Sequence, residues 1–242
     1  MTRSISIVIP AYNEEARLPA TLRQAIEYLN RTEWTFWEIL VVDDGSTDRT
    51  VACAEEFAKE NPGVRVLRNP GNRGKGYSVR NGMLQARGEW SLFTDADLSA
   101  PIEELDKLWS AVDRAQASGA IGSRALDRSL IEVHQPFYRE TLGKFFNFTM
   151  RAIVRLRFAD TQCGFKLFES RAAREIFGRQ RLNRFGFDVE VLFIARKLGL
   201  RILEIPVRWR NAEGSKVGML NGAQSFLDLL TIRLNQLRGK YR

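Results

Sequence analysis

Short β-rich apolar runs alternate with longer helical stretches through the first half of the chain, and this alternation limits the possible folds more than any other feature. Strands are predicted at 5–9, 38–42, 64–67, 90–94 and 119–122. Helices are predicted at 14–30, from a cap at Ser46 or Thr47 to about 59, at 74–87, and after Pro101. Such alternation is typical of parallel strands with helices on both faces of the sheet. The chain is therefore predicted to form a mostly parallel α/β sheet.

The second half of the chain is less regular. Helices are predicted at 137–158, 187–198 and 220–237. Residues 160–168 are predicted to be extended, and residues 202–209 to form an edge strand, because Pro206 lacks the N–H that a central strand needs. A glycine-containing loop at 211–218 leads into the last, amphipathic helix.

Length and charge suggest one domain with two unlike halves. The 242 residues, 44% of them hydrophobic, fit a single domain spanning 1–242. Residues 1–120 carry a net charge of −4 and residues 121–242 one of +12, so the second half is expected to face nucleic acid or an anionic membrane. The longest uncharged run, 217–227, is too short to span a bilayer. The apolar start at 1–10 is predicted to be a first core strand rather than a signal peptide.

The cysteine and histidine content excludes several kinds of site. Cys53 and Cys163 have neither metal-ligand spacing nor the count of a disulfide framework, which favours a reducing cytoplasm. His134 is the only histidine, so a serine–histidine triad and a multi-histidine zinc site are both improbable.

Asp95-Ala96-Asp97 is the sharpest chemical feature. In an extended segment, residues i and i+2 point the same way, so both carboxylates are expected to face one site. Two carboxylates with open coordination positions suit Mg²⁺ or Mn²⁺ holding a diphosphate. Taken alone, the triplet is equally compatible with two solvated aspartates at a strand end.

Two further segments follow predicted strands. The acids of Asp43-Asp44-Gly45-Ser46 are expected either to read a ribose or base, or to cap the next helix through Asp44 or Ser46. The run 71–76 fails both the P-loop and the dinucleotide-binding patterns. It is predicted to be a turn that opens a helix, with the alternative that Arg73 and Lys75 approach a diphosphate.

The ordered set of motifs resembles the family 2 glycosyltransferases, which have the glycosyltransferase A fold. The first four pieces are Ile7–Glu15, Val41–Asp48, Asn72–Gly76 and Thr94–Asp97. Later pieces resemble the dolichyl-phosphate glucosyltransferase branch, and they are Gly122–Arg124, Asp160–Phe168, Phe187–Glu190, Pro206–Trp209 and Gly214–Val217. The resemblance covers nearly the whole chain. It implies a single Rossmann-like domain with a nucleotide-sugar half at about 1–120, an acceptor- and membrane-facing half at about 121–242, and C-terminal amphipathic helices.

The resemblance also implies roles for individual residues. The nucleotide-sugar would be bound by Pro10, Tyr12, Glu14, Asp43, Lys75, Asp95 and Lys216. Catalysis would rest on Asp95 and Asp97, which would hold Mg²⁺ or Mn²⁺, and on Arg124 and Arg139, which would receive the lipid phosphate. Ser99 stands where the mannose synthase pattern has a glutamine ligand, which leaves the third protein ligand open.

The implied reaction is inverting transfer of a hexose, glucose from UDP-glucose, to a polyprenyl phosphate. The acceptor oxygen is already a nucleophile at neutral pH because its second pKa is near ~6, so no strong general base is required. Asp188 and Glu190 are expected either to contact acceptor-site sugar hydroxyls or to be surface acids on a helix. GDP-mannose as donor, or a soluble or polysaccharide acceptor, is the nearer alternative.

The basic half is expected to meet a membrane. The stretch 137–157 mixes aromatic and basic residues, as in helices that lie in a lipid interface. Composition alone favours a core-packing helix, and the charge asymmetry and the lipid acceptor favour the interface. The protein is therefore expected to be cytoplasmic and peripherally attached to the cytoplasmic membrane face. Nucleic acid is not an expected partner, because strand-end carboxylates repel phosphates unless a metal ion intervenes, and because the sequence lacks aromatic-rich RNA-binding strand motifs.

Overall fold

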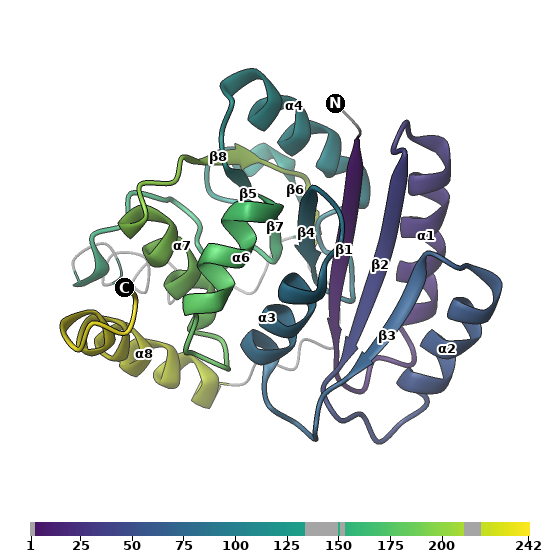
Figure 1. Cartoon of the computed structure of the whole chain (residues 1–242), viewed down its shortest axis with the longest axis horizontal. Helices are drawn as coiled ribbons and strands as arrows, with labels where there is room; N and C mark the ends of the chain where they lie inside the picture. Colours follow the sequence, from purple (N-terminus) through teal and green to yellow (C-terminus); the bar gives the residue numbers. More distant parts are fainter. Residues whose placement is uncertain (1–2, 134–149, 151–152, 211–218) are drawn as a thin grey trace.

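A seven-stranded sheet forms the centre of the protein (Figure 1). The computed structural model describes residues 3–133, 150, 153–210 and 219–242. The strands are β1 (Ser4–Ala11), β2 (Phe36–Asp43), β3 (Val64–Arg68), β4 (Trp90–Thr94), β5 (Gly119–Ser123), β7 (Phe165–Glu169) and β8 (Ile202–Pro206). Their order is β3-β2-β1-β4-β7-β5-β8. Only β7 runs antiparallel to its neighbours in this sheet, which confirms the predicted mostly parallel α/β class.

Helices cover both faces of the sheet. They are α1 (Leu18–Arg31), α2 (Thr50–Glu60), α3 (Lys75–Gln85), α4 (Leu105–Ala115, after the short helix η1, Ile102–Glu104), α6 (Ser170–Arg179), α7 (Phe187–Lys197) and α8 (Met219–Leu237). The core on one face includes side chains of α1, α2 and α4, and the core on the other includes those of α3, α6, α7 and α8. A short 3-10 helix η2 (Arg128–Leu130) and a small second sheet of β6 (Ile131–Val133) and β9 (Trp209–Arg210) complete the described elements.

The central strand β1 shows why these apolar runs form strands. Ile5, Ile7 and Ile9 enter the core on the α1 side, whereas Val8 enters the core on the α3 side. Successive side chains of a strand point to opposite faces, so a strand covered on both sides must be apolar throughout. Burial of both faces therefore selects the β-branched run that the sequence carries here.

The parallel strands bring the chemical residues to one edge. β1 pairs with β2 on one side and with β4 on the other, and both pairings are parallel. Ala11 lies opposite Asp43 in this register, so the ends of β1 and β2 coincide. The segments that follow β1, β2 and β4 consequently meet at the carboxyl edge of the sheet, where ligands bind in such folds.

Several predicted boundaries need correction. Ser46 and Thr47 do not cap α2, which begins only at Thr50, where Asp48 accepts the backbone N–H. Residues 155–158 are not helical, and Arg155 adopts a left-handed φ of 58°, so the helix predicted to reach 158 ends by Val154. The rest of that predicted helix lies largely outside the described residues, as does the loop at 211–218.

The prediction of an edge strand near Pro206 is confirmed, since β8 is the outer strand of the sheet. The strand pattern of 160–168 is confirmed only from Phe165 onward, where β7 begins. Helix α6 was not predicted. Within the described part of the chain, no helix is both long and apolar enough to cross a membrane.

Candidate active site

Asp95 and Asp97 directly follow β4, at the carboxyl edge of the sheet. Their side chains are 33% and 21% exposed, whereas Ala96 between them is packed in the core beside α1. Thr21 on α1 donates a 2.7 Å hydrogen bond to the Ala96 carbonyl, which fixes the backbone between the two acids. The sequence predicted an extended triplet, but Ala96 and Asp97 lie in a turn, in which the Leu98 N–H donates to the Asp95 carbonyl at 3.2 Å. Both carboxylates are nevertheless accessible, and the methyl of Ala96 is buried.

Two cations face these carboxylates. Lys75 Nζ lies 2.5 Å from Asp95 Oδ1, and Arg17 Nη1 lies 3.9 Å from Asp97 Oδ2. Burial lowers the pKa of Lys75, but the nearby carboxylates, Asp95 first among them, outweigh burial and raise the pKa above its ordinary value. Lys75 is therefore a cation at neutral pH. It lies where the negative charge of a diphosphate would need compensation.

Arg17 is a site residue that the sequence reasoning missed. Its guanidinium donates from Nε and Nη2 to the two carboxylate oxygens of Glu14, at 2.6 and 2.7 Å. Glu14 follows β1 and was predicted to line the nucleotide pocket. Its side chain holds Arg17, whose guanidinium also approaches Asp97, and the pocket-lining role stays a prediction. The spacing of Glu14 and Arg17, three residues apart at a helix start, was the available signal.

The acids at the end of β2 have a structural task. Asp43 accepts backbone N–H bonds from Gly45 and Ser46, at 3.1 and 3.2 Å, and so closes its own turn. Asp44 accepts from the backbone N–H groups of Arg73 and Gly74, at 2.9 and 2.7 Å. Backbone capping is therefore present in this pair, although Asp44 caps a distant loop rather than the next helix. The contact with a ribose or base stays a prediction.

The glycine-rich run is a turn that opens α3, as predicted. Gly74 precedes the helix with a φ of 101°, a left-handed value that favours glycine. A Cβ on Gly76 would lie 2.7 Å from the Leu182 carbonyl oxygen and 2.8 Å from the Phe187 Cβ. Both glycines thus allow the start of α3 to pack closely on the segment before α7. This packing presents Lys75 to Asp95.

Gly164 was part of a motif but had no predicted role of its own. A Cβ at this position would lie 2.2 Å from Asp95 Oδ2, so the Asp95 carboxylate packs directly on the Gly164 backbone. The neighbouring Cys163 is buried, and desolvation raises the pKa of its thiol to about 12. Cys163 is therefore a protonated packing residue rather than a nucleophile.

The interpretation of Asp188 and Glu190 as surface acids on a helix was wrong, because both side chains are buried. Their contact with sugar hydroxyls stays a prediction. Asp188 is buried at the start of α7 and forms an ion pair with the fully buried Lys166. Lys166 Nζ also donates to the Cys163 carbonyl at 2.7 Å, which supports the segment that carries Gly164.

Glu190 holds three separate parts of the chain together. Its Oε2 accepts the backbone N–H groups of Arg181 and Leu182, at 3.0 and 2.8 Å. Its Oε1 accepts the hydroxyl of Tyr241 at 2.6 Å. Desolvation by burial raises its pKa above the ordinary value. The residue anchors the C-terminal segment and the loop before α7 to the core.

Arg124 lies at the end of β5, where the sequence placed a phosphate ligand. Its Nε and Nη2 groups donate to the two oxygens of buried Asp160, at 2.6 and 2.8 Å. The guanidinium lies 5.3 Å from the centre of the Trp209 ring. Burial lowers the pKa of Arg124, but Asp160 raises it well above its ordinary value overall. Two donor groups of the Arg124 guanidinium, Nε and Nη2, are thus already bound to a protein carboxylate. The predicted partners Arg139 and Lys216 lie outside the described residues.

The donor set of the site fits a divalent cation that arrives with a diphosphate. Asp95 and Asp97 offer hard carboxylate oxygens, which suit Mg²⁺ and Mn²⁺. Among the described residues, no group of three or more acidic, histidine or cysteine side chains forms a complete metal site. Two protein carboxylates leave coordination positions that phosphate oxygens would fill.

Comparison with known proteins agrees with this geometry. Residues 6–177 match the family model described as Glycosyl transferase family 2. The dolichyl-phosphate beta-glucosyltransferase of Homo sapiens is 38% identical over 255 residues, which cover 100% of this chain and 78% of the relative. The enzyme of that name from Saccharomyces cerevisiae is 37% identical over 262 residues, which cover 98% of this chain and 76% of the relative.

Solved structures share the fold. Glucosyl-3-phosphoglycerate synthase from Mycobacterium tuberculosis, crystallised with Mn²⁺, UDP-glucose and phosphoglyceric acid, superposes with a TM-score of 0.69 at 20% identity. The match covers 95% of this chain and 79% of that chain. Mannosyl-3-phosphoglycerate synthase from Rubrobacter xylanophilus gives a TM-score of 0.71 at 17% identity, covering 98% and 74% of the two chains.

Proposed function

Because this chain belongs to glycosyl transferase family 2, we propose that it transfers glucose from UDP-glucose to a dolichyl-type polyprenyl phosphate. The names of its full-length relatives support this acceptor and this sugar. The proposal rests chiefly on Asp95 and Asp97, which are partly exposed at the carboxyl edge of the sheet. Lys75 and Arg17 lie next to their carboxylates.

We propose that Asp95 and Asp97 hold Mg²⁺ or Mn²⁺ together with the donor diphosphate. The bound ion would neutralise the charge that develops on the departing nucleoside diphosphate. Ser99 donates its backbone N–H to Asp97 Oδ1 at 3.0 Å, which orients that carboxylate. A solved structure with the same fold contains Mn²⁺ and UDP-glucose, which supports a divalent ion.

Lys75 would compensate diphosphate charge beside the ion. In the structure its ammonium group pairs with Asp95. Three residues at or after the end of β1 would line the nucleotide side of the site. Pro10 lies near the end of the strand, and Tyr12 and Glu14 follow it; Tyr12 is 39% exposed. Asp43 would shape that pocket through the turn that it closes. Lys216 would cover the diphosphate.

No protein base is required in this proposal, because a phosphate monoester is ionised at neutral pH with a second pKa near ~6. Its oxygen would attack the anomeric carbon in line, and the configuration at that carbon would invert. The carboxylate of Asp188 is engaged by Lys166, and Cys163 keeps its proton, so neither competes for the part of base or nucleophile. The protein would act by positioning and electrostatics.

The acceptor phosphate would bind at Arg124 and Arg139. Arg124 would use the N–H groups that do not bind Asp160, since a guanidinium has five donors. The acceptor lies in a membrane, so we also propose that the enzyme attaches peripherally to an anionic, cytoplasmic membrane face.

The test is incubation of the purified chain with polyprenyl phosphate, Mg²⁺ or Mn²⁺ and a panel of labelled nucleotide sugars. The expected product is a glucosylated lipid phosphate that moves into organic solvent, with UDP-glucose giving the highest kcat/KM. A higher kcat/KM with GDP-mannose would mean that GDP-mannose, not UDP-glucose, is the donor. Transfer only to a water-soluble or polysaccharide acceptor would mean that the acceptor is not a lipid phosphate.

A further inference from the structure

The outer face of α8 carries an exposed leucine ridge. Leu227, Leu230, Leu234 and Leu237 are 57%, 52%, 50% and 83% exposed. Their spacing of three, four and three residues places them along one side of a helix. The opposite side of α8 is accounted for, because Leu229 and Ile232 pack into the core with α7. A row of large apolar side chains in water marks an interaction surface.

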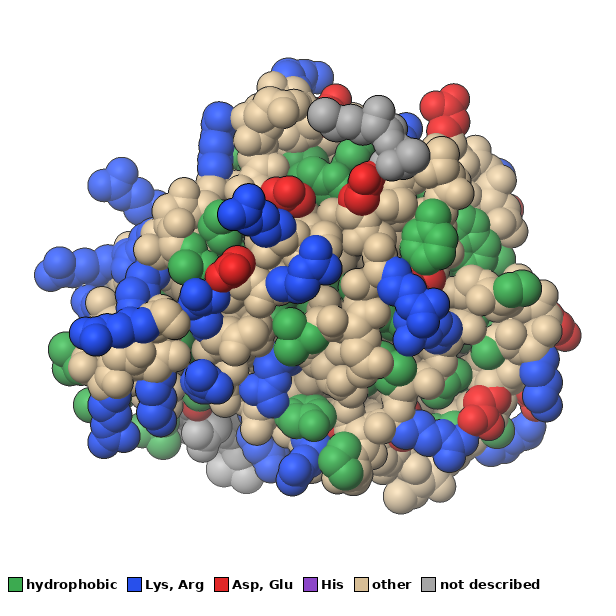
Figure 2. Space-filling view, in the orientation of Figure 1, with side chains coloured by type: hydrophobic (Ala, Val, Ile, Leu, Met, Phe, Trp, Pro, Cys, Tyr) green, Lys and Arg blue, Asp and Glu red, His purple; other side chains and the backbone are tan. Residues whose placement is uncertain are grey.

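The surroundings of this leucine ridge are basic. Among residues 227–242 the only acid is Asp228, which is buried, whereas the segment contains Arg233, Arg238, Lys240 and Arg242. In Figure 2, Lys and Arg side chains gather toward the left and lower edge of the molecule, the side on which Figure 1 shows α7 and α8. The apolar ridge thus lies in a positive field.

A group of three arginines, Arg155, Arg196 and Arg233, joins the ridge to the end of α7. Arg196 donates to the Arg155 carbonyl, and Arg233 donates to the Ile153 carbonyl at 2.7 Å. These backbone contacts fix two guanidiniums without neutralising them. Burial, Arg233 and Arg155 together lower the pKa of Arg196. Three like charges are therefore held together, an arrangement that an anion would relieve.

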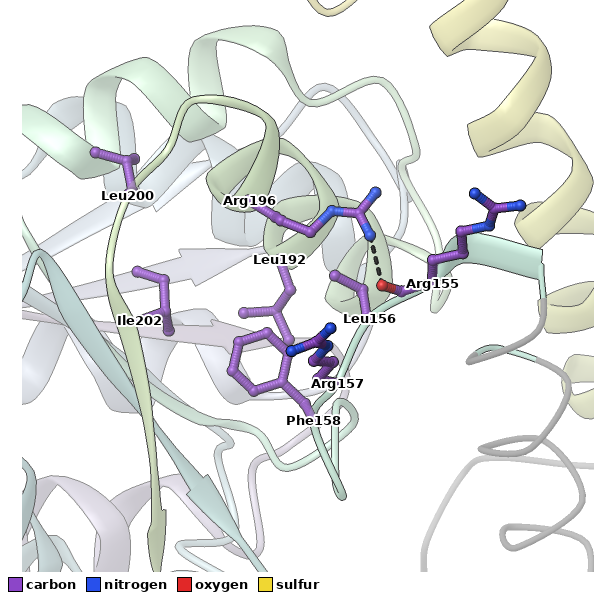
Figure 3. Close-up of a pocket in the computed structure, with 8 residues that line it drawn as sticks. All are labelled: Arg155, Leu156, Arg157, Phe158, Leu192, Arg196, Leu200 and Ile202. Carbon is purple, nitrogen blue, oxygen red and sulfur yellow. Dashed lines mark hydrogen bonds between the residues drawn. The ribbon is translucent and has the colours of Figure 1, made fainter.

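Arg155 and Arg196 also border a pocket of about 540 Å³ (Figure 3). Arg157 lines the pocket as well, whereas Arg233 does not; the remaining lining side chains are apolar, and no described Asp or Glu lines it. The close-up shows Arg155 beside α8, Leu200 and Ile202 on the opposite side of the pocket, and Arg196 and Arg157 between them. An anionic head group with an apolar tail matches this chemistry.

We propose that the leucine ridge of α8 and the arginine group dock on an anionic lipid bilayer, with the leucines among acyl chains and the guanidiniums at lipid phosphates. The inference rests on the proposed transfer to a lipid phosphate and specifies the surface that meets the membrane. A second copy of the chain is a poorer occupant, because an isologous pairing through this ridge would bring its flanking cations together.

The experiment is co-sedimentation of the full chain with vesicles of phosphatidylcholine alone or of phosphatidylcholine mixed with phosphatidylglycerol. The double variant Leu230→Ser/Leu234→Ser should bind the mixed vesicles about tenfold or more weakly at any salt concentration, because it removes apolar burial. The double variant Arg155→Gln/Arg196→Gln should bind weakly at low salt and resemble the wild type at 1 M salt, where the Debye length is ~3 Å. Leu84→Ser and Arg114→Gln, at exposed positions on α3 and α4, are the matched controls and should bind normally.

Undiminished vesicle binding by the leucine variant overturns the proposal, and so does equal binding to neutral and mixed vesicles. A concentration-dependent dimer in light scattering that the leucine variant abolishes would assign the ridge to a second copy instead. Transfer of glucose to a short, water-soluble polyprenyl phosphate separates this inference from the proposed function. The leucine variant should keep that transfer activity. If the wild type binds vesicles but shows no transfer, the transfer reaction is rejected and the membrane-docking surface is retained.

Discussion

The two aspartate pairs at the carboxyl edge of the sheet contain the same side chains, yet the protein treats them differently. Asp43 and Asp44, at the end of β2, are buried, and their oxygens accept hydrogen bonds from backbone N–H groups. Asp95 and Asp97, after β4, remain partly exposed and face side-chain cations. A carboxylate that accepts backbone hydrogen bonds builds the loops of a site, whereas one that faces side-chain cations and stays partly exposed remains available to a ligand.

The difference comes from what surrounds each strand end. The chain turns back after β2, so Asp43 meets the N–H groups of its own turn and Asp44 meets those of the loop before α3. After β4, the Asp95 carboxylate packs on the Gly164 backbone, and the nearby donors are the side chains of Lys75 and Arg17. The same residue type thus becomes structural or reactive according to its donors.

The largest expected effect is on turnover, from Asp97→Asn. The substitution removes a charge that would balance a divalent ion, so kcat should fall by about 10²–10³-fold or more. Asn keeps an oxygen for the Ser99 N–H, so the melting temperature should change little. The measurement is initial rate with UDP-glucose and lipid phosphate, with Asp113→Asn on α4 as the control. Full activity in this variant, or in excess chelator, would remove Asp97 from the ion-binding role.

Gly164→Ala should have the next largest effect, because the new methyl would lie 2.2 Å from Asp95 Oδ2. A shift of about 1 Å in a catalytic group costs on the order of 10²-fold in rate. The matched control is Gly178→Ala on α6, where a Cβ would meet nothing within 4 Å. Rates and melting temperatures of both variants should be compared. Equal rates would mean that the position of Asp95 does not depend on Gly164.

Asp44→Ala should chiefly reduce stability. It leaves the N–H groups of Arg73 and Gly74 and the Asn69 amide without their acceptor, and hydrogen bonds to a charged group contribute about 1.5–3 kcal/mol each. We expect the free energy of unfolding in urea to fall by about 2–4 kcal/mol, a range that allows for partial solvation of these donors. Asp97→Ala should change it by about 0.5 kcal/mol or less, as for surface substitutions. Equal losses would erase the distinction between the two pairs.

The smallest effect concerns pH and a third buried aspartate, Asp160. Burial raises the pKa of this carboxyl, but Arg124 outweighs burial and holds it below the ordinary value of 3.8. Since the folded value is lower than the unfolded one, the stabilisation is present above about pH 4 and is lost as pH falls through the folded value. The free energy of unfolding in urea should therefore fall more steeply below pH 4 for the wild type than for Asp160→Asn. Identical slopes would mean that the Arg124–Asp160 pair does not distinguish the folded from the unfolded state.

The sequence predicted the fold best where one physical rule decided the structure. The strands around Ile7, Val41 and Leu92 are apolar because both faces are covered, and their positions were predicted within two residues. The edge position of β8 followed from Pro206. Helix α2 began later than predicted, because Asp48 rather than Ser46 or Thr47 accepts the N–H at its start.

The parts of the site that were not predictable depend on contacts between distant segments. Asp188 and Glu190 have the pattern of surface acids on a helix, and only Lys166 and Tyr241 reveal that both are buried. The positioning role of Gly164 exists because β7 is inserted beside β4, a pairing that no local pattern announces. Asp95 and Asp97 were found because two carboxylates flank a small residue directly after an apolar strand, although the segment is a turn rather than the extended run that was predicted.

The insertion of β7 between β4 and β5 has a consequence for synthesis on the ribosome. β4 ends at Thr94, and its partner β7 starts only at Phe165, roughly seventy residues later. At a translation rate of about 5–20 residues per second, β4 is synthesised on the order of 4–14 seconds before β7. During this interval the nascent first half presents an unpaired, largely apolar strand edge, the kind that aggregates or attracts chaperones. The antiparallel strand that braces the active site therefore also sets the period in which the growing chain is most vulnerable.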